Sequence, residues 1–239
     1  MENCRRRFSL NLFDNSRVLN TAICISLPAS YVFNFESGRS KDTAYTYVEM
    51  EWCIPIDTFE IENVHLGELS TGPKPIVPFS YKDAELTFPS LVFVLPSVEV
   101  RSYNHTTGQL IISLEKSPSV LHKLVKFQEM LLSAVYTHHP TWFGVHMRKK
   151  QDILAKYQPL IENSNLHLYC PLQNQDIPLY SNETWTMGSN YANVLVPGKR
   201  VRLVFKLQGI SFHLHPNSGL WSGKFRIQHR INAILQMKN

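Results

Sequence analysis

Two segments near the end of the chain alternate basic and apolar residues in a way that suits contact with a polyanion. Their cations are Arg200, Arg202, Lys206, Lys224, Arg226 and Arg230. Because successive side chains of a strand point to opposite faces, each segment predicts a strand with one apolar and one cationic face. If both strands belong to one sheet, the cations form a stripe. Like charges directly opposite one another repel unless an anion lies between them, so the pattern predicts a polyanionic ligand.

Aromatic residues occur near the last two strands, in the segment 141–144 and in the strand expected at 45–54, and flat rings are the surfaces on which the bases of a single strand stack. The candidate stacking rings are Trp221, Phe212, Trp142, Tyr45 and Tyr47. Core packing is the alternative for each ring, and the glycines flanking Trp221 leave both its exposure and its burial open. A second basic cluster consists of Arg148, Lys149 and Lys150. It is either a further contact to the strand or the solvated start of a helix.

Motifs for other kinds of chemistry do not occur. The sequence contains no Gly-x-x-x-x-Gly-Lys phosphate loop, no Gly-x-Gly-x-x-Gly fingerprint and no Gly-x-Ser-x-Gly elbow. The four cysteines form no CxxC pair, and His213 with His215 fits one face of a strand end rather than a metal site. We therefore predict no enzyme, no metal site and no cofactor. A Cys–His nucleophile or a cryptic nuclease, for which Glu49 and Glu51 are the nearest carboxylate pair, stays an open alternative.

The elements that must position these residues are mainly strands. We expect strands at 18–27, 45–54, 91–100 and 110–114, and closing strands within about 199–234. Leu95-Pro96 is expected to end a strand, because proline cannot donate to the ladder. The proline-rich stretch 70–80 is expected to be an irregular loop, and Gly209 is expected to mark a bulge.

One helix is well signalled over about 118–137. Ser117 can act as its N-cap, and Pro118 suits the first helical position. An apolar stripe with helical spacing follows at Val120, Leu124, Phe127, Leu131 and Val135. His139-Pro140 is expected to stop the helix, the segment 141–144 to form an aromatic connector, and 147–157 to form a shorter helix.

Charge is distributed unevenly behind a modest formal net charge of +5. Residues 36–99 carry a net charge of −7, residues 100–239 carry +10, and no Asp or Glu follows Glu183. Such a basic segment attracts nucleic acid, an acidic membrane or an acidic protein, although ordinary solvated lysines remain the alternative. The 239 residues are 44% hydrophobic, which excludes disorder as the main state and suits a single domain spanning residues 1–239.

Targeting features are weak. No apolar run is long enough to cross a bilayer, and no secretory signal follows Arg5, Arg6 and Arg7. The dispersed cysteines do not form a disulfide scaffold. We expect an intracellular protein with reduced cysteines and no membrane partner.

The last part of the chain resembles the closing segment of single-stranded DNA-binding proteins of large DNA viruses and similar phage proteins. The resemblance lies in VPGKRVRLVFKLQGISF at 196–212 and GLWSGKFRIQHRI at 219–231. It implies an OB-fold core with a helix inserted before the last strands, and sequence-independent binding that protects single strands during replication. By position it points to the six cations of the alternating segments. The acidic tail of many relatives is missing, because this chain ends in Gln236-Met-Lys-Asn.

These observations lead to one prediction with open alternatives. We expect a mainly β (α+β) chain forming an OB-like β-barrel with an inserted helix and long loops. It would bind single-stranded DNA in DNA replication or recombination, in the host nucleus or at a viral replication site if the protein is viral. RNA as the ligand and self-association on DNA stay open. The main rival is a β-rich virion structural or interaction protein with a basic genome-facing surface.

Overall fold

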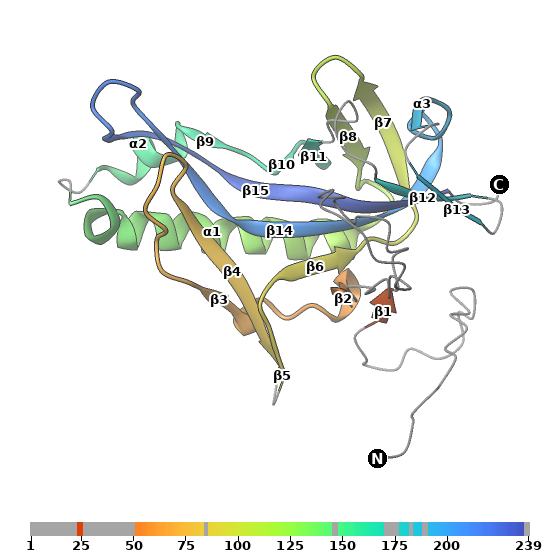
Figure 1. Ribbon diagram of the computed structural model, residues 1–239, viewed down its shortest axis with the longest axis horizontal. Coiled ribbons are helices and arrows are strands. Elements are labelled where there is room, and N and C mark those ends of the chain that lie inside the picture. The colour runs from red at the N-terminus through yellow and green to blue at the C-terminus, as the bar shows by residue number, and fades with distance from the viewer. Residues whose placement is uncertain are drawn as a thin grey trace, which may run out of the picture.

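The last two strands form a long antiparallel ribbon around which the other elements are arranged (Figure 1). The computed structural model describes residues 23–25, 51–83, 86–144, 148–169, 177–181, 184–187 and 191–236. The ribbon consists of β14 (Arg200–Leu214) and β15 (Trp221–Gln236). Both strands fall within the predicted closing region, which is confirmed.

The remaining strands join the ribbon in one mixed sheet. They are β1 (Ile23–Ile25), β2 (Glu51–Pro55), β3 (Val64–Leu66), β4 (Ile76–Asp83), β5 (Leu86–Phe88), β6 (Leu91–Val94), β7 (Val98–Asn104), β8 (Gln109–Ser113), β9 (Tyr157–Gln158), β10 (Ile161–Glu162), β11 (Asn165–Tyr169), β12 (Pro178–Ser181) and β13 (Thr184–Met187). The helices are α1 (Pro118–Phe143), α2 (Lys150–Leu154) and α3 (Tyr191–Val194), with short 3-10 turns η1 (Ile56–Thr58) and η2 (Ile61–Asn63). The prediction of a mainly β chain with one long helix is confirmed.

The two edges of the ribbon are covered differently. Along its outer edge β14 pairs successively with β7, β6 and β4. Along its own outer edge β15 pairs with β9 near Phe225 and with β12 near Ile234, both in parallel. Between these points β11 approaches β15 without any pairing among the described residues, and the strand path that ends in β11 and β10 is therefore open. We call this gap the seam.

Helix α1 runs along the ribbon and supplies much of the core (Figure 1). All five residues of the predicted stripe are buried. Phe127 packs edge-on against Phe59, which in turn meets Phe93 at 4.7 Å between ring centroids, and Phe93 lies 5.6 Å from Phe205 of β14. This series of rings joins the helix to the ribbon, and each aromatic pair adds about 1 kcal/mol beyond the area that it buries.

The end of α1 differs from the prediction, because the helix passes through Pro140 and reaches Phe143. Proline has no N–H to donate to the carbonyl of Tyr136, four residues earlier. The buried ring of His139 lies with its Nδ1 2.9 Å from that carbonyl oxygen, which compensates for the missing bond. The helix stops instead at Gly144, whose left-handed φ of 60° suits glycine.

Other boundaries are confirmed or corrected. The break at Leu95-Pro96 is confirmed, because β6 ends at Val94 and β7 begins at Val98. Ser117 is the N-cap residue of α1, although its side chain makes no capping hydrogen bond. The expected helix at 147–157 is wrong in extent, since α2 spans only Lys150–Leu154 and Tyr157 begins β9. The predicted strands at 18–27 and 45–54 lie partly outside the described residues.

The loop expected at 70–80 is partly wrong, because β4 begins at Ile76 and contains Pro78. Here β4 lies against β14 at the bulge, where the register shifts between Leu207 and Gly209. A Cβ on Gly209 would overlap the carbonyl oxygen of Val77, so only glycine permits this approach. The bulge expected at Gly209 is thus confirmed, and it is the feature that brings β4 onto the ribbon.

Candidate nucleic-acid interface

The two faces of the ribbon have opposite character. One face turns Leu203, Phe205 and Leu207 into the core beneath α1. The opposite face carries the cations of both strands together with a second buried apolar cluster that includes Val204, Ala233 and Leu235, and Lys206 stands directly across from Arg230 in the ladder. This is the like-charge arrangement that costs free energy unless an anion intervenes. We call this surface, formed by Arg202, Lys206, Lys224, Arg226 and Arg230, the cation face.

The cation face continues toward the hairpin end of the ribbon. Arg226 lies opposite Ser211, and alternation along β15 places it on the same side as Arg230. His213 reports the local field: its pKa is lowered, first by partial burial and then by the positive charges of Arg226 and Lys224. The charges of Lys224 and Arg226 therefore both act at the hairpin end of the ribbon.

No carboxylate balances this surface from within the ribbon, because neither β14 nor β15 contains Asp or Glu. The ion pairs found among the described residues, Arg101–Glu115 and Lys116–Glu99, lie around β7 and β8. In the part of the chain that the structure describes, Lys224, Arg226 and Arg230 make no ion pair. The positive charge of these three side chains remains available to an external anion.

The cations at the start of β14 are tied to the protein more closely. The guanidinium of Arg200 donates to the hydroxyl of Ser97, with 3.0 Å between Nε and Oγ. Arg202 is half-buried, its Nε lies 3.4 Å from the carbonyl oxygen of Leu95, and burial lowers its pKa. These two residues hold β14 against the segment between β6 and β7, so their contribution to an external ligand is smaller than the alternation alone predicts.

Two of the candidate stacking rings are buried. Trp221 and Phe212 are each 2% exposed, so core packing, the alternative left open for each, is what the structure shows. Trp142 is half-buried and packs on Phe212, with 5.6 Å between ring centroids. The physical reason is the extension of α1, whose last turn covers this end of the ribbon. Tyr45 and Tyr47 lie outside the described residues.

The second basic cluster is divided between two roles. Arg148 lies over the ring of Trp221, 5.0 Å from its centroid, and donates from Nη2 to the Trp221 carbonyl at 3.2 Å. This cation–π contact and the hydrogen bond hold the half-buried Arg148 against Trp221. Lys149 and Lys150, at the start of α2, are exposed, as expected for a solvated helix start or a further phosphate contact.

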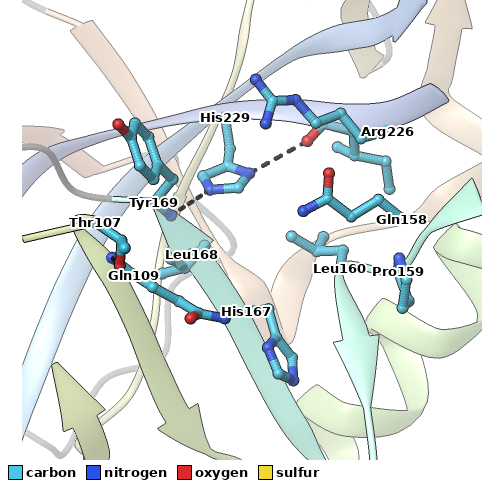
Figure 2. Close-up of a pocket in the computed structure, with 11 residues that line it drawn as sticks. Thr107, Gln109, Gln158, Pro159, Leu160, His167, Leu168, Tyr169, Arg226 and His229 are labelled. Carbon is cyan, nitrogen blue, oxygen red and sulfur yellow. Dashed lines mark hydrogen bonds between the residues drawn. The ribbon is translucent and has the colours of Figure 1, made fainter. Parts of the chain in front are cut away.

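An exposed ring that the sequence prediction missed lies at the seam. Tyr169, the last residue of β11, is 49% exposed and lines a cavity together with Arg226 (Figure 2). The cavity has a volume of about 340 Å³ and lies between β8, β9, β11 and β15. The strand pattern at 165–169, with Leu166 and Leu168 alternating with polar or aromatic residues, was a usable signal for β11. Nothing in the pattern indicated that β11 lies beside β15.

His229 bridges the seam. Its Nε2 accepts a hydrogen bond from the backbone N–H of Tyr169 at 2.7 Å, and its Nδ1 lies 3.2 Å from the carbonyl oxygen of Ile227 (Figure 2). Because Nε2 accepts, the proton of the neutral ring sits on Nδ1 and points to that carbonyl. Burial lowers the pKa of His229 to about 4, and the nearby charge of Arg226 acts in the same direction. The ring is therefore neutral at physiological pH.

Two further features bear on the range of functions. Among the described residues, no group of three or more His, Cys, Asp or Glu is placed to hold a metal ion. None of the helices in the described ranges is long and apolar enough to cross a membrane.

Comparisons with models of known protein families, with curated proteins and with solved structures find no match to this chain.

Proposed function

We propose that this protein binds single-stranded DNA without sequence preference, with the phosphates lying along the cation face of the ribbon. The observation that carries the proposal is that Lys224, Arg226 and Arg230 make no ion pair in the described part of the chain, on a ribbon whose two strands contain no acidic residue. An extended chain of phosphates lying between such side chains turns a repulsive arrangement into a favourable one. In this role the protein would protect single strands during DNA replication or recombination.

The architecture supports an extended ligand. Antiparallel pairing places the row of Lys224, Arg226 and Arg230 on β15 beside Lys206 of β14, and the core lies beneath the opposite face of the ribbon. The proposal includes the fold: the neighbouring strands β15, β14, β7, β8 and β11, in that order, form an opened OB-type barrel, and α1 is inserted before the last two strands of the chain. The bridge from His229 to β11 is the contact that supports this interpretation, because it links the two ends of the succession.

The role of base stacking is narrower than the sequence predicts. Trp221 and Phe212 serve the core, so phosphate contacts carry most of the affinity in this proposal. Binding dominated by phosphate contacts is strongly salt-dependent, with a slope of about −0.7 per neutralised phosphate on a single strand. The salt dependence is therefore the quantity that reports on the cation face.

The test replaces two cations that make no ion pair in the described part of the chain, in the double variant Arg226→Ala/Arg230→Ala. Fluorescence anisotropy with a labelled oligo(dT) across a salt series should show weaker binding and a slope reduced by about 1.4, because two phosphate contacts are lost. The matched control is Lys74→Ala/Lys126→Ala, which removes the same charge from exposed positions before β4 and on α1. An unchanged affinity of the Arg226/Arg230 variant at low salt would contradict the proposal.

A further inference from the structure

The cavity at the seam is more than a gap between strands, because its lining is graded from inside to outside. Its floor is apolar: Leu160, Leu168 and Ile227 are each at most 3% exposed. Its sides carry the amides of Gln109 and Gln158, both on exposed residues of neighbouring strands. The lining contains no carboxylate. The interior therefore offers an apolar surface edged by groups that both donate and accept hydrogen bonds.

The mouth of the cavity has a different character. The close-up shows the guanidinium of Arg226 and the phenol ring of Tyr169 on either side of His229, at the rim of the space (Figure 2). Arg226 belongs both to this rim and to the cation face. A strand whose phosphates lie along the cation face must therefore pass the mouth of the cavity.

The chemistry of the lining selects the ligand. A nucleobase has apolar faces and an edge that carries both hydrogen-bond donors and acceptors, and amide side chains suit such an edge. The phosphate attached to the same nucleotide needs a cation outside the pocket, and Arg226 provides one. A volume of about 340 Å³ lies at the small end of the range for ligand pockets, which suits one nucleotide rather than two.

We infer that the seam cavity takes one nucleoside monophosphate unit, with its base between Gln109 and Gln158 and its phosphate at Arg226. The ring of Tyr169 stacks on the neighbouring base at the mouth. The inference rests on the single-strand binding proposed above and adds a definite position at which one base leaves the surface. His229 positions the site, because its bond to the Tyr169 N–H sets how far β11 stands from β15.

The test fills the cavity without touching a cation. Gln158→Trp places a large ring in the space, and the matched control Gln151→Trp makes the same change on the exposed surface of α2. Binding is measured for oligo(dT) and for an oligonucleotide of equal length whose residues are all abasic. We expect wild type and Gln151→Trp to bind oligo(dT) about 50-fold more tightly than the abasic strand, because one base lies in the cavity and a second stacks on Tyr169. We expect Gln158→Trp to keep only the preference of about 5- to 10-fold that stacking on Tyr169 supplies.

The outcomes separate the two proposals. If Gln158→Trp keeps the full wild-type preference for oligo(dT), the cavity site is wrong, while binding along the cation face stands. If the preference falls to the part that Tyr169 supplies but the salt slope is unchanged, both proposals are supported, because the phosphate contacts then survive the filled cavity. If wild-type protein binds neither oligonucleotide, both proposals are wrong.

A cross-linking experiment tests whether the pocket takes a nucleotide within a strand, a free nucleotide or both. An oligo(dT) with a single 5-iodouracil is cross-linked by light, and the attached peptide is identified by mass spectrometry. We expect the attachment at His167 or Tyr169, and attachment confined to other parts of the chain would overturn the inference. Excess free thymidine 5′-monophosphate that removes this cross-link while the strand stays bound shows that the pocket also accepts the free nucleotide. A persistent cross-link assigns the pocket to nucleotides within a strand.

Discussion

The protein contains two groupings of an arginine, an aromatic residue and a histidine, one in the core and one at the seam. The core grouping is Arg148, Trp221 and His139, and the seam grouping is Arg226, Tyr169 and His229. In each, the histidine accepts a hydrogen bond from a backbone N–H through Nε2, from Arg148 at 3.0 Å and from Tyr169 at 2.7 Å. In each, Nδ1 approaches a backbone carbonyl oxygen.

The difference lies in what covers the ring. Trp221 is 2% exposed and stacks on Phe143 of α1, with 4.9 Å between ring centroids, so its arginine and histidine serve to close the core. Tyr169 is 49% exposed, and its grouping opens onto a cavity. Burial alone decides whether an aromatic ring beside an arginine holds the protein together or faces a ligand. Composition and spacing do not distinguish the two cases.

The largest effect is expected from Trp221→Ala, which empties the core grouping. Removing a large buried ring leaves a cavity and should lower the free energy of unfolding by about 3–5 kcal/mol. Urea denaturation followed by circular dichroism measures the loss. A change of less than about 1 kcal/mol would show that Trp221 is not the packing centre of this end of the ribbon and would remove the contrast with Tyr169.

A smaller effect is expected from the pH response of the seam. The pKa of His229 is lowered from 6.5 to about 4 in the folded protein. Above pH 6.5 the ring is neutral in both states, so its contribution to stability is fully present. As the pH falls from 6.5 toward about 4, the unfolded chain takes up a proton that the folded protein excludes, and stability is lost. At about pH 5 the loss from this group should be about 2 kcal/mol.

The comparison protein for the pH experiment is His229→Gln, which has no titrating ring at this position. Urea midpoints near neutral pH and at about pH 5 are measured for both proteins, so that the other titrating groups cancel. Wild type should lose about 2 kcal/mol more than the variant on acidification. Equal losses would mean that His229 is protonated without cost and does not bridge the seam as a neutral ring.

The smallest effect on stability is expected from Tyr169→Ala, the counterpart of the Trp221 substitution. Because the ring is exposed, the free energy of unfolding should change by at most about 0.5 kcal/mol. The affinity for oligo(dT) should nevertheless fall about 5- to 10-fold through lost stacking, whereas Tyr169→Phe, which keeps the ring, should bind as wild type does. A large loss of stability in Tyr169→Ala would mean that this ring packs in the core, as Trp221 does, and does not face a ligand.

The local sequence pattern was sufficient to predict the long helix, the last two strands and the positions of their basic residues. The stripe from Val120 to Val135 is buried as its spacing predicts, and the alternation along 201–207 gives the two faces of β14. These features depend only on the period of the helix and of the strand. The pairing of Lys206 with Arg230 depends in addition on the register shift between Leu207 and Gly209, where one extra residue of β14 is inserted.

Contacts between distant segments could not be predicted in this way. The helix passes Pro140 because the His139 ring satisfies the carbonyl that proline leaves without a partner. Trp221 is buried because Arg148, 73 residues earlier, covers its ring. The seam depends on β11 lying beside β15, and no spacing within either strand specifies that neighbour. The sequence pattern therefore predicted the cations of the ribbon but not the neighbouring ring of Tyr169 or the amides of Gln109 and Gln158.

Binding of matched single-stranded and double-stranded oligonucleotides across a salt series tests the central claim most directly. Fluorescence anisotropy should show tighter binding of the single strand at every salt concentration, with an affinity that falls as salt rises. A single-stranded RNA of the same sequence in competition decides between the two nucleic acids. Tighter binding of the duplex, or an affinity independent of salt, would contradict the account of the cation face.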